Sequence, residues 1–236
     1  IKSLEKSGIK FIFGKEITEI SGEKVLAGSE EVASGKVILV TTREADLTAL
    51  KDVNLEISNG NVVADDKMLS NLKNVYVPGD INGKNLLAHA AFKMGNIVAS
   101  EIVEGKSDKY NNNVIPRAIY TYPEIGSVGL TEEEAKKSYD VKVGKFNYGA
   151  NGRALAHGDS SGMVKIISDA RYGEILGAHI VGPRASELIN EVSVLMQSEV
   201  IIEEAIKMVF GHPTFSEAIY EAIADVEGVS VHLPKK

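Results

Sequence analysis

The chain has 236 residues, of which 44% are hydrophobic and 25% are charged, so it can bury a core as one large domain or two small ones. Its net charge is -7, and its Lys and Arg residues are scattered rather than gathered into a stripe, which argues against a nucleic-acid partner. No apolar run approaches the roughly 20 residues that cross a bilayer, and no leader precedes a cleavage site. We therefore expect a cytoplasmic protein with no membrane partner.

Residues 1–46 are typical of the end of an α/β domain. A helix-compatible segment at 1–7 precedes Gly8, a suitable C-terminal cap, and residues 9–13 are a strand candidate. An alternating segment at 16–21 and the apolar run 36–40, which has the pattern of a buried strand, come next. We expect a remnant of a nucleotide-binding domain whose earlier strands lie outside this sequence.

Residues 47–113 contain a predicted strand, loop and helix. A short apolar strand at 75–80 ends in a turn, and apolar residues then recur at helical spacing from Leu87 to Ile102. The polar run 107–113, with three consecutive asparagines, is the best linker candidate. We place a domain boundary there.

Residues 114–236 show strands first and helices later, the order of an α+β domain with an antiparallel sheet flanked by helices. Residues 169–173 join two of the strands as an antiparallel hairpin. The predicted strands are 117–121, 141–148, 163–168 and 174–181, and the predicted helices are 185–198, 202–209 and 215–224.

The segment 211–217 holds the sharpest chemical feature. His212 lies just before a helix start, and Glu217 follows five residues later. An imidazole held by a carboxylate is suited to general acid/base work. The alternative is structural, because Thr214 and Glu217 have the spacing of a capping box and His212 would then be a bystander. Both interpretations hold together if Glu217 serves the ring as well as the backbone.

Asp80 follows Gly79 at the end of a predicted strand, where open α/β sheets place their ligands. The following helix could turn its amino-terminal amides toward an electron-rich group, and Asp80 could accept hydrogen bonds from sugar or polyol hydroxyls. The alternative is that Gly-Asp is only a turn dipeptide. His89 we interpret as a packed helical histidine rather than a ligand.

No metal site is predicted, because the remaining histidines lie far apart without metal-ligand spacing. The chain has no cysteine, and so no disulfide, thiolate nucleophile or thiolate ligand. No two glycines are separated by a single residue, so the G-x-G-x-x-G dinucleotide fingerprint is absent. Thr131 and Glu134 form another capping box and need no functional explanation.

Three stretches in order resemble the pyridine nucleotide disulfide oxidoreductases. Residues 75–80 with 86–89 resemble the flavin-contacting motif, and residues 120–131 resemble the opening of the interface domain. The third is the His-Pro-Thr segment at 212–214. Between the last two, residues 151–154 and 182–189 look like dihydrolipoamide dehydrogenases in particular, and the resemblance covers essentially the whole chain as a carboxyl-terminal half.

The resemblance implies that Asp80 hydrogen-bonds the ribityl chain of FAD and that the backbone at Ala88 approaches the flavin ring. It implies that His212 is the acid/base, oriented by Glu217. In such homodimers this histidine takes a proton from dihydrolipoamide at the other subunit, the substrate thiolate attacks a cysteine disulfide, and electrons pass through FAD to NAD⁺. The implied partner is a lipoyl-bearing acyltransferase or lipoyl protein of a 2-oxoacid dehydrogenase or glycine cleavage complex.

Several parts of the family pattern are missing from this sequence: the FAD fingerprint, the redox cysteine pair and the unit that binds the NAD pyrophosphate. Residues 42–46 read Thr-Arg-Glu-Ala-Asp where the family shows Gly-Arg-x-Pro-Asn, and Phe210-Gly211 replaces His-Ala. We therefore expect no turnover and little FAD retention from this chain alone. The alternatives are another disulfide reductase, a non-catalytic dimerisation module and a truncated product.

Two further expectations concern geometry. We expect a cis His212–Pro213 peptide, with Glu217 bonded to one ring nitrogen and the other nitrogen facing a partner subunit. We also expect a two-fold homodimer through residues 115 onward, because the helix at 185–198 carries an apolar face that water would disfavour.

Overall fold

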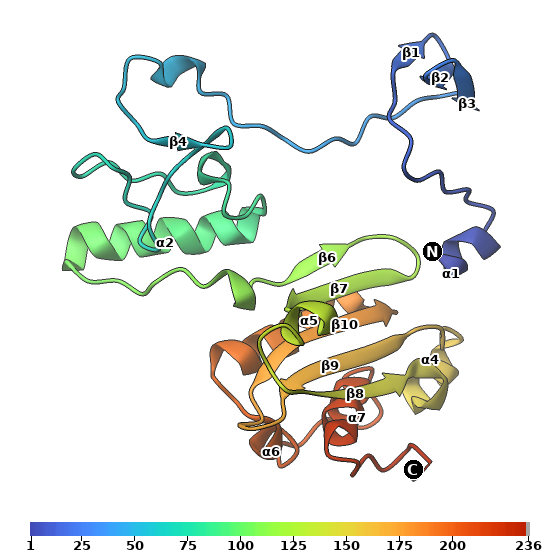
Figure 1. Ribbon diagram of the computed structural model, residues 1–236. Helices are drawn as coiled ribbons and strands as arrows, with labels where there is room; N and C mark the ends of the chain where they lie inside the picture. Colours follow the sequence, from blue (N-terminus) through green and yellow to red (C-terminus); the bar gives the residue numbers. More distant parts are fainter. Residues whose placement is uncertain (235–236) are drawn as a thin grey trace.

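The computed structural model describes residues 1–234, which form three regions in chain order (Figure 1). The first region is a small antiparallel sheet in the order β1-β2-β3. Val25 is the only buried side chain among residues 1–46. The elements are α1 (Lys2–Lys6), β1 (Glu19–Ser21), β2 (Lys24–Ala27) and β3 (Glu30–Ser34).

The structure confirms the first helix but not the strands predicted at 9–13 and 36–40, which were wrong. Ile38, Leu39 and Val40 are 84%, 71% and 89% exposed, and no described strand pairs with them. A strand needs neighbours for its backbone groups and side chains. Residues 36–40 do have the apolar pattern of a buried strand, but no strand of the described chain lies beside them.

The second region is built on the long helix α2. Its inner face, with Ala90, Met94 and Ile97, packs on Met68, and Gly105 ends the helix in the left-handed conformation at φ 69°. The strand predicted at 75–80 is wrong, since only an isolated bridge joins Tyr76 to Leu69. The elements are η1 (Thr48–Leu50), β4 (Ile57–Ser58), β5 (Asn61–Val62), η2 (Asp80–Asn82) and α2 (Ala88–Glu104).

The third region is a five-stranded antiparallel sheet in the order β6-β7-β10-β9-β8. The hairpin predicted at 169–173 joins β9 to β10, and all four predicted strands are present. The strand β7 was not predicted. The strands are β6 (Arg117–Ile119), β7 (Glu124–Gly129), β8 (Val141–Asn147), β9 (Met163–Asp169) and β10 (Ile175–Gly182).

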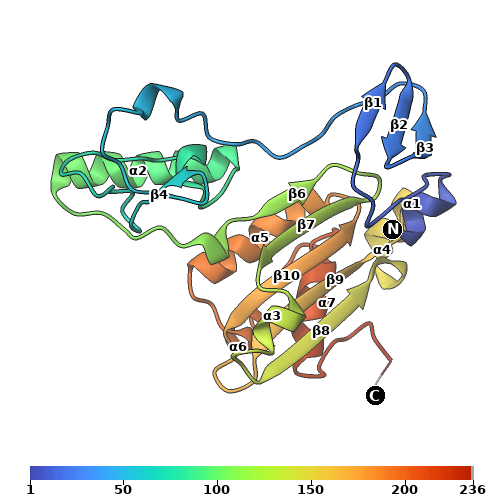
Figure 2. The same ribbon diagram turned by 45° about the horizontal axis from the view of Figure 1, so that its top comes forward.

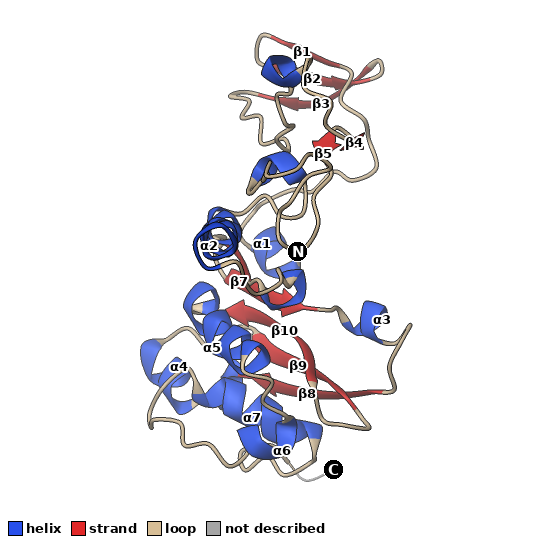
Figure 3. Ribbon diagram, turned by 90° about the vertical axis from the view of Figure 1, so that its left-hand side faces the viewer, coloured by secondary structure: helices blue, strands red, loops and turns tan. Residues whose placement is uncertain are grey.

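Helices α5 and α7 share one core with the sheet, whereas α3 packs on the opposite face (Figure 3). At Gly144 a Cβ would collide with the carbonyl of Ala222, so α7 lies directly on β8. The helix predicted at 202–209 is shorter, and the one predicted at 215–224 begins two residues later. The elements are η3 (Asn112–Val114), α3 (Glu132–Ala135), η4 (Tyr148–Ala150), α4 (Gly152–His157), α5 (Ala185–Gln197), α6 (Ile202–Ala205) and α7 (Glu217–Val226).

One argument for a dimer was wrong, because the apolar face of α5 is already buried within its own chain. Leu188 and Val192 are buried in the core of their own chain, with Leu195 and Met196 packed against it. Strands β7 and β10 cover this face, so it needs no second subunit. No helix of the described chain combines the length and apolar character that a membrane crossing requires.

Candidate active site

The start of α7 brings His212 and Glu217 together. Nδ1 of His212 lies 2.8 Å from Oε1 of Glu217, and the Thr214 amide donates to Oε2 at 2.7 Å. The carboxylate is mostly covered, at 21% exposed, whereas the histidine side chain is 77% exposed. The predicted contact is therefore confirmed, with the ring at the surface and the carboxylate beneath it.

The surroundings of Glu217 favour its ionised form. Partial burial raises the pKa, but hydrogen bonds from the Thr214 amide and the His212 ring outweigh burial and leave the pKa below its ordinary value. A carboxylate accepts a hydrogen bond from Nδ1–H, which places the proton on that nitrogen. Nε2 of His212 is then the nitrogen that can take a proton from another molecule.

The capping-box alternative for Thr214 is half right. Glu217 does accept from the Thr214 amide, but the Thr214 hydroxyl donates to the Gly211 carbonyl at 2.7 Å instead of reaching the helix. The residue before the helix is Ser216, whose side chain makes no cap. One carboxylate therefore serves both the loop backbone and the ring. The His212–Pro213 peptide is cis, as predicted.

The second predicted site, Asp80 and Ala88, lies at the amino-terminal end of α2. Gly79 has φ 88°, which favours glycine, and it turns the chain into η2. Leu87 precedes α2 without a side-chain cap, so the first amides of a 17-residue helix keep their capacity to donate to an electron-rich group. The Asp80 side chain is 41% exposed. A carboxylate and a helix start fit the polyol and ring of a flavin, and they offer no cradle for a diphosphate.

Arg43 is a residue of this site that the sequence did not assign to it. Its Nη2 lies 3.2 Å from Oδ2 of Asp80 and donates to the Leu86 carbonyl at 2.7 Å. The interpretation of His89 as a packed histidine is wrong. His89 is exposed, and its Nε2 lies 2.7 Å from the Pro116 carbonyl oxygen.

The structure does not bring the two predicted sites together within one chain. Helix α2 lies beyond the β6 edge of the sheet, whereas α7 packs on β8 and β9 at the other edge (Figure 2). Among residues 1–234, no group of three His, Asp or Glu side chains could hold a metal ion.

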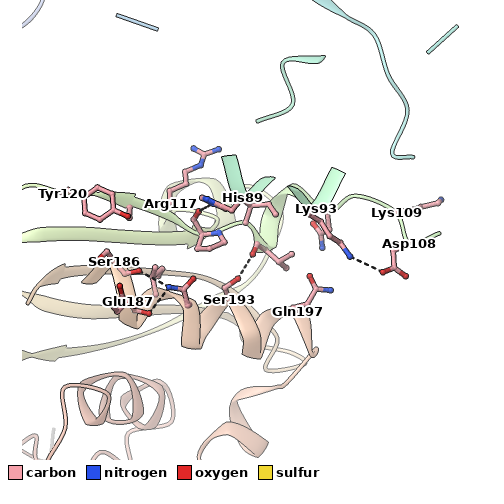
Figure 4. A pocket seen from close by; sticks show the side chains of 17 residues that line it. His89, Lys93, Asp108, Lys109, Arg117, Tyr120, Ser186, Glu187, Ser193 and Gln197 are labelled. Atoms are coloured by element: carbon pink, nitrogen blue, oxygen red, sulfur yellow. Dashed lines mark hydrogen bonds and ion pairs between the residues drawn. The ribbon is translucent and has the colours of Figure 1, made fainter. Parts of the chain in front are cut away.

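A cavity of about 800 Å³ lies between α2 and α5 (Figure 4). His89 and Lys93 line one side and Ser193 and Gln197 the other, and Lys93 pairs with Asp108 at 3.2 Å. None of the predicted site residues His212, Glu217, Asp80 and Ala88 lines it. The cavity marks the junction between the second and third regions.

Sequence reasoning also missed a second histidine–carboxylate pair, formed by Glu221 of α7 and His232 beyond the end of that helix. Glu221 is 3% exposed, and its Oε1 lies 2.7 Å from Nδ1 of His232. Its Oε2 accepts from the amides of Val231 and His232 and from the Ser230 hydroxyl. A signal existed, because Glu221 is four residues after Glu217 and therefore on the same face of the helix.

Comparison with known proteins places the chain in a family. Residues 1–95 match the model of the pyridine nucleotide-disulphide oxidoreductases, and residues 115–223 match the dimerisation domain of the same proteins. The chain belongs to the pyridine nucleotide-disulphide oxidoreductase family, whose members use FAD and NAD(P).

The curated relatives include several dihydrolipoyl dehydrogenases. The one from Rhizobium etli is 35% identical, over 96% of this chain and 50% of its own length. The one from Bacillus subtilis is 38% identical, over 78% and 40%. The chain thus spans about half the length of the curated relatives it matches.

Two solved structures share the fold. LpdA from Mycobacterium tuberculosis has a TM-score of 0.87 at 21% identity, over 95% of this chain and 51% of its own. The HOCl-induced flavoprotein disulfide reductase RclA from Escherichia coli, as its Cu(II) complex, has a TM-score of 0.85 at 23% identity, over 95% and 53%.

Proposed function

We propose that residues 1–236 supply the carboxyl-terminal part of a flavoprotein dihydrolipoyl dehydrogenase, which oxidises protein-bound dihydrolipoamide with NAD⁺. The observation that carries the proposal is the His212–Glu217 pair, an exposed imidazole held by an ionised carboxylate within the segment that matches the dimerisation domain. The dihydrolipoyl dehydrogenases among the relatives support dihydrolipoamide as the substrate, rather than the substrate of another disulfide reductase.

His212 acts as the acid/base in this proposal. Nε2 takes the proton from a thiol of dihydrolipoamide, and the resulting thiolate attacks a cysteine disulfide. Glu217 holds the Nδ1–H, aligns the ring and stabilises the imidazolium that forms. This chain contains no cysteine, so the disulfide belongs to a segment outside it.

FAD, when bound, supplies two-electron transfer between that disulfide and NAD⁺. The described residues that would contact it are few. Asp80 would accept a hydrogen bond from a polyol hydroxyl, and the α2 amides beginning at Ala88 would face the ring. Arg43, already paired with Asp80, would hold that carboxylate in place. These contacts alone predict weak FAD retention by this chain.

A homodimer completes the proposed site. Helix α2, which begins at Ala88, lies beyond the β6 edge of the sheet, and the His212 loop leads into α7, which packs on β8 and β9 at the other edge, so the histidine would serve a flavin held by the partner (Figure 2). The exposure of His212 supports this arrangement, and the match to a dimerisation domain favours it. The lipoyl-bearing partner, the cytoplasmic location and the domain limits 1–46, 47–113 and 114–236 stay predictions.

The test compares dihydrolipoamide-dependent NAD⁺ reduction by three proteins: the native gene product, its His212→Gln variant, and residues 1–236 alone. General acid/base catalysis contributes about 10²- to 10⁴-fold, so the variant should lose kcat/KM by that factor. Residues 1–236 should show no turnover.

His179→Gln is the matched control, since that histidine contacts the Leu130 carbonyl and, in the described structure, neither Glu217 nor the His212 loop, and it should keep near-native activity. Full activity of His212→Gln would remove the assigned role. Turnover by residues 1–236 alone would contradict the need for a disulfide from elsewhere. A native product that forms dimers but never turns over would favour the non-catalytic module.

A further inference from the structure

The loop that carries His212 is held by a side chain far away in the sequence. Asn151, which is 3% exposed, donates from Nδ2 to the Thr214 carbonyl at 3.1 Å. Its Oδ1 accepts from the Ala154 amide at 2.9 Å and caps α4. In the described chain, this is the only hydrogen bond that ties residues 211–214 to anything other than the loop itself and Glu217.

The segment that carries Asn151 also packs against Phe215, the residue after Thr214. Phe215 is 6% exposed, and its ring meets Tyr148 edge-on with centroids 6.3 Å apart. The His157 ring also meets Phe215 edge-on, with centroids 5.7 Å apart. Tyr148 precedes Asn151 and His157 ends α4, so residues 148–157 contact both Thr214 and Phe215.

We propose that Asn151 is a positioning residue for His212: by fixing the Thr214 peptide it aligns the His212 ring with Glu217. The proposal deepens the proposed function and rests on it. Thr214 is held at its amide by Glu217 and at its carbonyl by Asn151, so its backbone is fixed on both sides. Pro213 restricts the step between Thr214 and His212.

The alternative is that Asn151 only caps α4. Its two functions separate chemically, because the cap uses the acceptor Oδ1 and the loop contact uses the donor Nδ2. Asn151→Asp keeps an acceptor suited to an N-cap and loses the donor. A carboxylate would also face the Thr214 carbonyl unfavourably. A pure capping role therefore predicts no change at His212, whereas a positioning role predicts one.

The experiment is ¹⁵N NMR of the His212 ring in residues 1–236 at about pH 8, where an imidazole is ordinarily neutral. We compare the wild type with Asn151→Asp and Glu217→Gln. In the wild type the ring should show a hydrogen-bonded Nδ1–H. In Asn151→Asp the ring signals should shift toward those of Glu217→Gln, because the ring leaves its single orientation. Amide signals of β9 and β10 report whether the third region stays folded.

Two further variants keep the test decisive. Asn111 caps η3 in the same chemical way, so Asn111→Asp should leave the His212 signals unchanged. Asn151→Ser retains a capping hydroxyl but is too short to reach Thr214, so it should reproduce the shift even if the aspartate variant does not fold. Unchanged His212 signals in folded Asn151→Ser would overturn the proposal. The readout does not depend on turnover, so an inactive enzyme and a misassigned Asn151 give different results.

Discussion

The first and third regions of this molecule treat apolar residues in opposite ways. In the first region Ile38, Leu39 and Val40 face solvent, and a single side chain, Val25, is buried. In the third region a sheet and its helices enclose one continuous core that includes Phe146, Tyr148, Ile166, Ile180, Val192 and Ile219. The two regions carry similar apolar patterns, so the pattern alone does not decide burial.

The difference lies in what each region finds to pack against. Burial of an apolar side chain is worth about 1.5 to 3 kcal/mol, but only where other groups remove it from water. In the third region, strands β7 to β10 and helices α4 to α7 all contribute side chains to one core. The run 36–40 has no described strand beside it. Exposed apolar surface of this kind is typical of an interaction site.

Hydrogen exchange gives the largest expected contrast between the two regions. No described backbone amide from 36 to 40 donates a hydrogen bond, whereas those of β9 and β10 pair across the sheet. Core amides exchange through costly openings, so β9 and β10 should exchange roughly 10³-fold or more slowly than residues 36–40. Exchange measured by mass spectrometry checks this. Equal protection would show that residues 36–40 are covered in solution.

Truncating one buried side chain in each region should show the same difference between the two regions, with a smaller effect. Ile180 is fully buried in the third region, and Ile180→Ala should reduce the free energy of unfolding by about 2 to 5 kcal/mol. Val25 is 9% exposed in a three-stranded sheet with no other buried side chain, so Val25→Ala should cost less than Ile180→Ala. Urea unfolding followed by circular dichroism measures both. A larger loss at Val25 would contradict the comparison of cores.

The third region was the easiest to predict because its signals are local. The strand predicted at 141–148 is Val141–Asn147, and the one predicted at 174–181 is Ile175–Gly182. The alternation of apolar and polar residues, together with the turn at 169–173, was enough to predict these strands. The strand β7 was missed, since its glycines weaken the pattern. At Gly126 a Cβ would collide with the Ala185 carbonyl, so this glycine is there for the close approach of α5.

The candidate site was predictable in the same local sense. His212 and Glu217 lie five residues apart around a helix start, and their contact follows from that spacing. The Asn151 contact to Thr214 joins residues 63 apart, and no local pattern encodes it. The pairing of Arg43 with Asp80 likewise depends on how two regions meet. The role of each residue in catalysis stays a prediction.

The segment 230–232 lies at the end of the third region, but polar contacts to Glu221 hold it rather than the apolar core. Glu221 accepts from Ser230, Val231 and His232. In Glu221→Gln an amide NH₂ would face some of these donors, and buried groups left unsatisfied cost about 1 to 3 kcal/mol. Glu227→Gln is the control, since its exposed pair with Lys142 should be worth less than about 1 kcal/mol. Urea unfolding at neutral pH compares the two.

The same carboxylate should make stability depend on pH. Burial raises the pKa of Glu221, but the hydrogen bonds from Ser230 and His232 outweigh it and bring the pKa below its ordinary value. A carboxyl whose pKa is depressed by folding adds stability above its unfolded pKa of about 4.3. That stability is lost as the pH falls through the lower folded-state pKa. The difference in unfolding free energy between wild type and Glu221→Gln should therefore be full at neutral pH and shrink below about pH 4, with the amide signals of Val231 and His232 reporting the release of the segment. A difference that stays constant down to about pH 2 would show that the charge of Glu221 does not hold this segment, and that its contacts act through shape alone.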